Sequence, residues 1–426
     1  MNLLNKDINI EKIRIKEKNQ EADLYYCYTD KFKTFYTSVI FLFDYNESIR
    51  PVNILLAYLL DRTTSKHPNE EEFVGYLYNL YDMMHNISQN QIGLIDYITF
   101  RTGTVNTKYI HDDINLLNKS VELLEEAVFC PNFDTEIFEE IKESLIENIK
   151  NKNNNKVSVA YDRFFNEMFK NELINTKVLR DVNIIKNITI DDVKVAYENL
   201  LKMPHIYFYV GEDKKEDVIP RLSGFDFPIM IKQNLEKVDS ETKEISLEQI
   251  ITQEFNVNQS NIFVGYRTNI RADSEDYYAM HVLNLMIGDY SNSDLFKIVR
   301  EEHGLSYNIY SVYNPDKGYM IIKGGIAKDN FDITFDLIKK IIDKYQTGNI
   351  SEEALNITKK GVITAIISSL DTFSSTYNSA IAYAINGKIR LLEEKINSIN
   401  SLTTEDIKRV ANTLILDTVY FMKGNK

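Results

Sequence analysis

Two hydrophobic periods alternate along this chain, and together they predict a mixed α+β fold. Residues 31–46, KFKTFYTSVIFLFDYN, alternate in polarity and are rich in β-branched and aromatic residues, which is typical of a strand. The segments that follow place apolar residues three and four positions apart, the spacing of a helix that buries one face. The further predictions for this half are helices near 50–62 and 69–85, strands from about 92 to 108, and helices at 113–128, 134–153 and 156–171.

The second half begins with another strand pattern, SNIFVGYRT at residues 260–268. The sequence NPDKG at 314–318 predicts a hairpin with a type I turn and a bulge, because proline fits the second position and glycine can leave the turn. Segments of helical spacing surround this hairpin, at 275–288, 328–346, 351–368 and 374–385.

The chain also repeats itself at an offset of about half its length. ITIDDVKVAYENLL at 188–201 aligns with LTTEDIKRVANTLI at 402–415, each with a threonine N-cap followed by an acid and one helical pattern. A closing strand follows in both copies, YFYVG at 207–211 and YFMKG at 420–424. Such a repeat indicates that the architecture is duplicated.

A second aligned pair supports the duplication. FDTEIFEEIKESLIENI at 133–149 matches ISEEALNITKKGVITAI at 350–366, and each begins with a helix-start signal. We therefore predict two tandem homologous α+β domains, each an antiparallel-rich sheet packed with helices. The predicted boundaries are residues 1–215 and 259–426, joined by a polar linker at 216–258.

Composition narrows the classes of function. The chain has 426 residues, and 44% hydrophobic with 12% aromatic residues indicate a globular protein long enough for more than one core. A formal net charge of −14 argues against nucleic-acid or anionic-membrane partners and is compatible with cationic peptides.

The cysteines and the apolar runs bear on location. Cys27 and Cys130 are far apart and form no CxxC motif, which favours neither a metal knuckle nor a disulfide framework and fits a reducing compartment. The first residues, MNLLNKDINIEKIRIK, lack the apolar core of a secretory signal, and the run VIFLF at 39–43 is far shorter than a membrane span. We expect a cytoplasmic protein with no membrane partner.

One short stretch carries candidate chemistry, REEHGLSYNIYS at 300–311. Gly304 can end a helix in the left-handed conformation, and the alternation after it predicts a strand. Arg300 then lies in the last helical turn and Tyr307 at the start of the strand, so both can point at one spot. The alternative is structural: arginine complements a helix dipole, and strand tyrosines commonly pack at the edge of a core.

The histidines offer no metal motif. No two of them lie three or four residues apart, and none lies beside a suitable acid on a helix. We therefore interpret them as surface or packing residues: His67, His85, His111, His205, His281 and His303.

Two segments resemble the pitrilysin/insulinase family of zinc peptidases, which includes the mitochondrial processing peptidase. They are NILLAYLLDRTTSKHPNEEEFVGYLYNLYDM at 53–83 and VREEHGLSY at 299–307, and the tandem halves agree with that family's fold. The first segment looks like the zinc-lacking members that occur beside a zinc-bearing partner in bacterial two-component processing peptidases, which are encoded in clusters for peptide maturation or for elongation-factor P modification.

The resemblance also shows what this chain lacks. Active members carry HxxEH on a first-half helix, where two histidines bind zinc and the glutamate serves as general base. The matching positions are Ile54, Ala57 and Tyr58, and no histidine precedes His67. The sequence therefore predicts no metal site and no cofactor in this chain, with zinc in the partner subunit.

A glutamate pair remains from the family's pattern. Glu140 and Glu147 match the spacing at which a later helix completes the zinc site. Charged amphipathic helices normally carry carboxylates at such intervals, and one carboxylate without the histidines cannot hold zinc. We interpret Glu147 as vestigial.

The resemblance assigns a role to the pair described above. In the family, an arginine and a tyrosine seven residues apart contact the substrate backbone and the oxyanion of the scissile carbonyl, and Arg300 and Tyr307 match them. This implies the zinc-lacking subunit of a heterodimeric metallopeptidase that processes peptides, inactive alone, with a zinc-bearing HxxEH paralogue as partner. An edge strand in segment 95–108 could pair with an extended peptide. The alternatives are a non-catalytic peptide-binding module or a structural core subunit.

Overall fold

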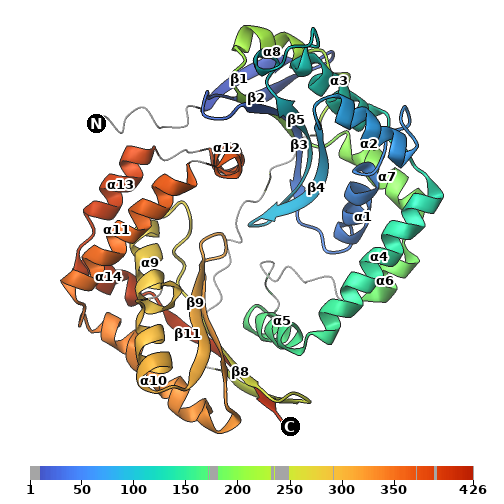
Figure 1. Cartoon of the computed structure of the whole chain (residues 1–426). Coiled ribbons are helices and arrows are strands. Elements are labelled where there is room, and N and C mark those ends of the chain that lie inside the picture. Colours follow the sequence, from blue (N-terminus) through green and yellow to red (C-terminus); the bar gives the residue numbers. More distant parts are fainter. Residues whose placement is uncertain are drawn as a thin grey trace.

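Two β-sheets, each backed by helices, form the protein. The computed structural model describes residues 10–170, 172, 181–231, 235, 249–290, 292–370, 372–387 and 391–425. Figure 1 shows the sheets on the inner side of the two halves and most helices on the outer side. None of the helices within these ranges is long and apolar enough to cross a membrane.

The first sheet has the strand order β1-β2-β6-β3-β5-β4. Its strands are β1 (Ile10–Lys16), β2 (Glu21–Tyr28), β3 (Thr34–Asp44), β4 (Met84–Ile92), β5 (Ile95–Val105) and β6 (His205–Gly211). The helices of this half are α1 (Arg50–Leu60), α2 (Glu70–Asn79), α3 (Leu116–Phe129), α4 (Thr135–Asn154), α5 (Lys156–Met168), α6 (Val182–Asn187), α7 (Ile190–Leu200) and α8 (Lys215–Leu222), with a 3₁₀ turn, η2 (Thr107–Tyr109).

The second sheet has the order β7-β11-β8-β10-β9. Its strands are β7 (Gln249–Phe255), β8 (Ser260–Arg267), β9 (Ser306–Asn314), β10 (Tyr319–Ile326) and β11 (Ile415–Gly424). The helices are α9 (Tyr277–Asn284), the π-helices η3 (Leu285–Asp289) and η4 (Leu295–Glu302), the 3₁₀ turn η5 (Lys328–Asn330), α10 (Phe331–Gln346), α11 (Glu352–Ser369), α12 (Phe373–Asn386), α13 (Leu392–Asn400) and α14 (Thr404–Ala411).

The sheet topology confirms the duplication. The order β2-β6-β3-β5-β4 corresponds strand by strand to β7-β11-β8-β10-β9. In both sheets the first of these pairs is parallel and the following pairs are antiparallel. The aligned helices α7 and α14 both begin with a capping box, Thr189 with Asp192 and Thr403 with Asp406. The predicted two-domain α+β class is therefore confirmed.

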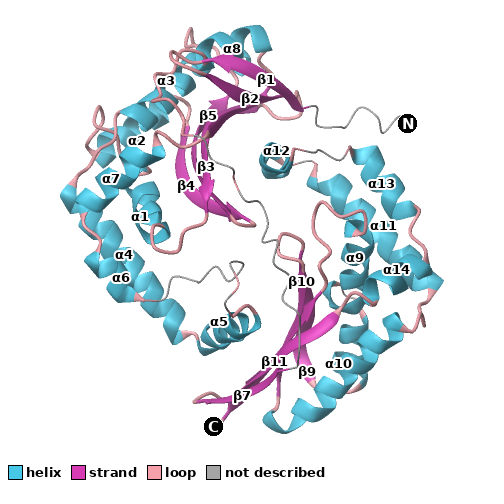
Figure 2. Ribbon diagram, turned by 180° about the vertical axis from the view of Figure 1, so that it is seen from behind, coloured by secondary structure: helices cyan, strands magenta, loops and turns pink. Residues whose placement is uncertain are grey.

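The inner face of each sheet is covered by a helix from the other half of the chain (Figures 1 and 2). Phe164 and Met168 of α5 are fully buried against Phe263 and other residues of the second sheet. Tyr377 and Ile381 of α12 lie buried on the first sheet. The two halves thus exchange α5 and α12.

A glycine permits the close approach of α5. A Cβ at Gly265 of β8 would lie 2.5 Å from the Met168 sulfur and 2.9 Å from the Phe164 ring. The guanidinium of Arg267, at the end of the same strand, holds Glu172 just after α5 at 2.7 Å. The exchanged helix is therefore fixed by both packing and charge.

Some boundaries differ from the sequence predictions. The helix predicted over 69–85 ends at Asn79, because Tyr81 and Asp82 adopt left-handed backbone conformations (φ 62° and 52°) and the chain enters β4. The predicted linker 216–258 contains most of helix α8 and all of strand β7. Its residues 232–234 and 236–248 lie outside the described residues. The division into domains at these boundaries stays a prediction.

We expect Phe164→Ala in α5 to lower the free energy of unfolding by about 3–5 kcal/mol, because it leaves a cavity between α5 and the second sheet. Since the chain has no tryptophan, urea unfolding followed by far-UV circular dichroism is the suitable measurement. Val195→Ala, at a position 56% exposed on α7, is the control and should change stability by less than about 0.5 kcal/mol. An equal effect of both substitutions would show that α5 is not packed as described.

Candidate functional site

Arg300 and Tyr307 meet at the start of β9. The Arg300 guanidinium lies 4.8 Å from the centre of the Tyr307 ring and 4.5 Å from that of Phe296. Gly304 has φ 61°, so the helix ends and turns into the strand there, as the sequence predicts. The two side chains therefore form one contact from two elements.

The helix that carries Arg300 has π geometry. His303 N–H donates to the Ile298 carbonyl five residues back, at 3.2 Å. π-Helices are rare and frequently occur at functional sites. Gly288 of the preceding π-helix has no room for a side chain, since a Cβ would lie 2.6 Å from the backbone nitrogen of Ser311 in β9. The same Cβ would lie 2.5 Å from the Leu295 side chain, so η3 packs closely against both the strand and the start of η4.

The pair is accessible and carries positive charge. The Tyr307 side chain is 80% exposed. Among the described residues no carboxylate forms an ion pair with Arg300, whose N–H groups could therefore serve a ligand. A guanidinium and a phenol side by side can donate hydrogen bonds to a carbonyl oxygen or an oxyanion.

The three positions that match the zinc motif lie on α1. On α1, Ile54 is half-buried, Ala57 is 1% exposed and Tyr58 is 48% exposed. Two of these side chains are aliphatic and offer no nitrogen, oxygen or sulfur ligand. Zinc therefore does not fit this helix.

The two glutamates of α4 lie at the surface. Glu140 is mostly exposed, with an oxygen 3.8 Å from Nη2 of Arg62. Glu147 is also exposed. Within the described ranges no group of three or more histidine, cysteine, aspartate or glutamate side chains could hold a metal ion. Glu147 therefore has the surroundings of an ordinary surface carboxylate.

Two of the histidines contact glutamates and aromatic rings. His67 lies 2.8 Å from Glu126 and stacks on Tyr76 at 4.3 Å. His205 and the hydroxyl of Tyr207 both contact the buried Glu17 carboxylate, at 2.7 and 2.6 Å. His205 and Tyr207 hold the pKa of Glu17 below its ordinary value against the effect of burial, which raises it. Sequence alone gave no signal for this cluster, because Glu17 lies far from the other two residues along the chain.

The predicted edge strand is wrong. β5, at Ile95–Val105, pairs with β3 on one side and β4 on the other, so β4 is the edge strand at this end of the first sheet. The sequence could not place this strand within the sheet, because alternation and β-branched residues mark a strand but not its position among the other strands. Part of the true edge is occupied, since the Ile87 N–H of β4 donates to the Asp61 carboxylate at 2.5 Å.

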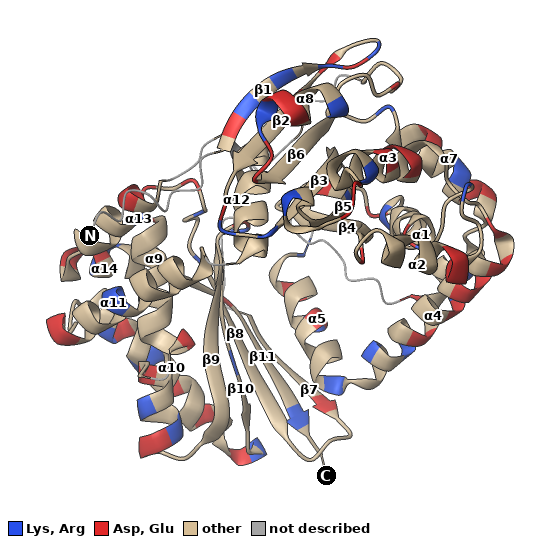
Figure 3. Ribbon diagram, turned by 45° about the horizontal axis from the view of Figure 1, so that its top comes forward, with Lys and Arg blue, Asp and Glu red and all other residues tan. Residues whose placement is uncertain are grey.

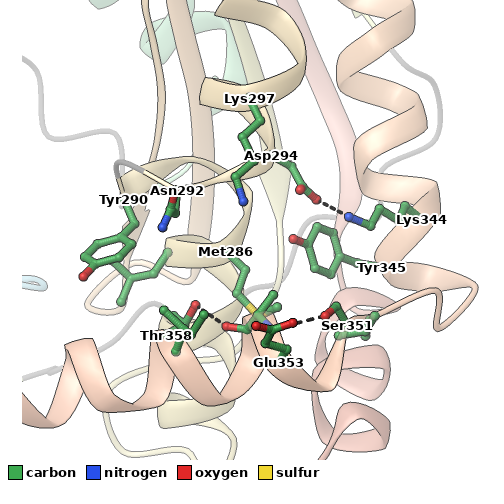
Figure 4. A pocket seen from close by; sticks show the side chains of 14 residues that line it. Met286, Tyr290, Asn292, Asp294, Lys297, Lys344, Tyr345, Ser351, Glu353 and Thr358 are labelled. Carbon is green, nitrogen blue, oxygen red and sulfur yellow. Dashed lines mark hydrogen bonds and ion pairs between the residues drawn. The ribbon is translucent and has the colours of Figure 1, made fainter. Parts of the chain in front are cut away.

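A cavity of about 370 Å³ lies in the helix layer of the second half (Figure 4). Asp294 and Lys344 form an ion pair of 2.7 Å there, beside the buried Tyr345. Burial and the neighbouring Asp294 raise the pKa of Tyr345. Lys297 of η4 lines the cavity, whereas Arg300, three residues later, is not among its described lining residues. The cavity and the Arg300–Tyr307 pair are therefore separate features of η4.

Comparison with known proteins defines the class. The family profile described as peptidase M16 inactive domain matches residues 187–362. A conserved protein from Enterococcus faecalis V583 has a similar structure, with a TM-score of 0.89, 22% identity and coverage of 98% of this chain and 99% of that one. The peptidase M16 inactive domain from Pseudomonas fluorescens gives a TM-score of 0.75 at 17% identity, with coverage of 98% and 99%. The fold is that of M16-like peptidases.

The sequence comparison is more specific. The chain is 27% identical over 425 residues to the probable inactive metalloprotease YmfF of Bacillus subtilis (strain 168), covering 97% of this chain and 98% of that protein. The resemblance to the pitrilysin/insulinase family is thus confirmed: residues 187–362 match the profile of the M16 inactive domain, and nearly the whole chain is similar to a probable inactive metalloprotease.

Elemental analysis of the purified full-length chain should find well below one zinc ion per chain, because Ile54 and Ala57 provide no ligand. A relative that carries HxxEH, purified in the same way, is the control and should keep about one zinc. Tightly held zinc in stoichiometric amount in this chain would contradict the expectation.

Asp61 should make stability depend on pH. Burial raises its pKa to about 6, and its place at the C-terminal end of α1 also disfavours the charged form. In the unfolded chain this carboxyl ionises near pH 4. The contribution of Asp61 to the free energy of unfolding therefore falls between about pH 4 and 6 and stays low above pH 6. Asp61→Asn keeps the acceptor oxygen and removes this loss. Between pH 4 and 7, urea unfolding should therefore show the variant gaining on the wild type by on the order of 2 kcal/mol.

The control is Asp273→Asn, which removes an exposed carboxylate. Its stability relative to the wild type should not change between these pH values. If Asp61→Asn behaves in the same way, the buried-carboxylate explanation is wrong.

Proposed function

We propose that this chain is the zinc-lacking subunit of a heterodimeric metallopeptidase that processes peptides. Its partner is a paralogue that carries HxxEH and the zinc ion. In this proposal the chain does not cleave peptides alone, acts in the cytoplasm, and uses residues 1–215 and 259–426 as the two domains that face the partner.

The observation that carries the proposal is the exposed contact of Arg300 with Tyr307. When water attacks a scissile carbonyl, negative charge develops on its oxygen, and donors already in place stabilise that charge. A guanidinium stacked on a neighbouring ring is held in one orientation, so little reorganisation is needed when the charge appears. Arg300 and Tyr307 would contact the substrate in trans while the partner activates the water.

The contrast with α1 supports this assignment. At the motif positions an aliphatic side chain is buried, which suits packing and excludes metal chemistry. At β9 an aromatic side chain is 80% exposed although its burial would be favourable. Packing alone accounts for the residues at the motif positions of α1. It does not account for the exposed tyrosine on β9.

A second candidate function is a non-catalytic peptide-binding or structural core subunit. The observation that favours it is that stacking between Arg300 and Tyr307 is itself a stabilising contact, which a purely structural role would account for. The two functions differ in whether the pair affects a cleavage rate.

The test combines the full-length chain with a zinc-bearing HxxEH paralogue from the same organism and measures cleavage of a fluorogenic peptide library. The mixture should cleave, and neither chain should do so as well alone. Arg300→Ala and Tyr307→Phe should each lower kcat of the mixture by about a hundredfold, the usual effect of losing one oxyanion donor.

Two substitutions serve as matched controls. Lys297→Ala removes an exposed cation from the same π-helix, and Tyr78→Phe removes a hydroxyl from a tyrosine that is 74% exposed on α2. Both should leave kcat unchanged. Cleavage that is equal for the wild type and both site variants would refute the role of the pair in trans. Peptide binding without cleavage in the presence of the partner would favour the second function.

A further inference from the structure

A second cavity, of about 300 Å³, opens on the inner face of the second sheet, between α5 and the strands β8 to β10. Tyr310 of β9 and Lys323 of β10 line it and face each other in the register of the two strands. The start of α5 closes the other side with Tyr161. The cavity therefore adjoins the edge strand that carries Tyr307.

Lys323 is the charged group of this cavity. Its ammonium lies 4.8 Å from the ring centre of Tyr161 and 5.1 Å from that of Tyr310. Within the described part of the chain it forms no ion pair with a carboxylate, and no aspartate or glutamate is among the cavity's described lining residues. Aromatic rings hold a cation in place without neutralising its charge. The cavity is thus positively charged and favours an anionic ligand.

The charge stands out against the rest of the molecule. The chain has a formal net charge of −14, and Figure 3 shows acidic residues spread over outer helices such as α4 and α7. Asn155 and Ser158 at the start of α5 also line the cavity, but α4 ends at the same place, so the positive end of α5 is opposed by the negative end of α4 and Lys323 supplies the charge.

The backbone shapes the cavity as well. The Asn308 side-chain oxygen accepts a hydrogen bond from the Gly325 N–H at 3.1 Å, which fixes the amide at the wall. A Cβ at Gly325 would lie 2.4 Å from the Gln259 side chain and 3.0 Å from that same Asn308 oxygen. The absence of a side chain at Gly325 therefore keeps this part of the inner face open.

We propose that this cavity is a subsite for a carboxylate of an extended peptide lying along β9. The proposal rests on the function proposed above, and it names the substrate class: peptides with an acidic group at one defined position. β9 is the edge of its sheet, so a peptide can pair with its backbone, and Lys323 then receives the carboxylate.

The spacing of the strand sets the position of the acid. Tyr310 follows Tyr307 by three residues, and the register shifts between them, since Ile309 pairs with Gly324 but Ser306 with Ile326. The two tyrosines are therefore at most about 10 Å apart along the strand. A peptide whose scissile bond lies near Arg300 and Tyr307 meets Lys323 two or three residues away. Either an acidic side chain at that distance or the free carboxylate at a chain end supplies the anion.

The test measures binding of fluorescein-labelled decapeptides to the full-length chain alone, by fluorescence anisotropy. The first peptide is built from serine, valine and glycine with one central glutamate and an amidated C-terminus. The second replaces the glutamate by glutamine, and the third has the glutamine and a free C-terminal carboxylate. The first or the third should bind roughly tenfold more tightly than the second, the usual worth of one hydrogen-bonded charge.

Variants assign that preference to Lys323. Lys323→Gln should abolish the discrimination between carboxylate and amide peptides, whereas Lys340→Gln, an exposed lysine on α10, should leave it intact. Far-UV circular dichroism establishes that both variants are folded. Tight binding of the first peptide identifies an acidic side chain as the ligand, and tight binding of the third alone identifies a chain end.

Equal affinity for all three peptides, discrimination that survives Lys323→Gln, or no measurable binding at millimolar peptide would each overturn the subsite. These outcomes are independent of the function test, because no partner and no zinc are present. Carboxylate preference without any effect of Arg300→Ala on cleavage by the mixture would leave the subsite standing and refute only the role in trans.

Discussion

Both faces of each sheet have to be covered by other elements. The chain achieves this by exchanging helices between its two halves. The outer faces are covered by helices of the same half, but the inner faces are covered by α5 and α12, which come from the opposite one. Exposed apolar sheet faces of this size would be unfavourable in water, so neither half is complete by itself. The exchange also places α5 beside β9 and β10, where Tyr161 and Lys323 meet. The proposed subsite therefore exists only because the halves are interlocked.

Much of the fold followed from the sequence, because the signals are local. The threonine caps of α7 and α14, the strand alternation of β3 and β8, and the hairpin at 314–318 each depend on residues close together in the chain. The repeat then fixed the correspondence of the two sheets. The errors are of a different kind. The predicted helix over 69–85 includes the first two residues of β4, most of β4 has no predicted element, and β5 is predicted at the edge, because the order of strands depends on contacts distant in sequence.

The same distinction applies to the sites. Arg300, Gly304 and Tyr307 lie within one short segment, so their convergence could be predicted and their contact is observed. Their role in catalysis remains a prediction. The cavity at Lys323 brings together four segments separated by up to about 170 residues, from Asn155 to Gly325, and no local pattern marks it. The missing zinc motif was evident because an absence of histidine can be established from composition and position alone.

The π geometry of η4 has a consequence for how Arg300 is aimed. A π-turn accommodates one residue more than an α-turn, so the direction of every later side chain in the helix depends on that extra residue. If the turn became α-helical without losing a residue, the guanidinium would rotate by about 100° around the axis, whereas losing one residue at the same time would keep its direction. Homologues with an α-helix one residue shorter at this place would therefore aim the arginine in the same direction, whereas an α-helix of unchanged length would not.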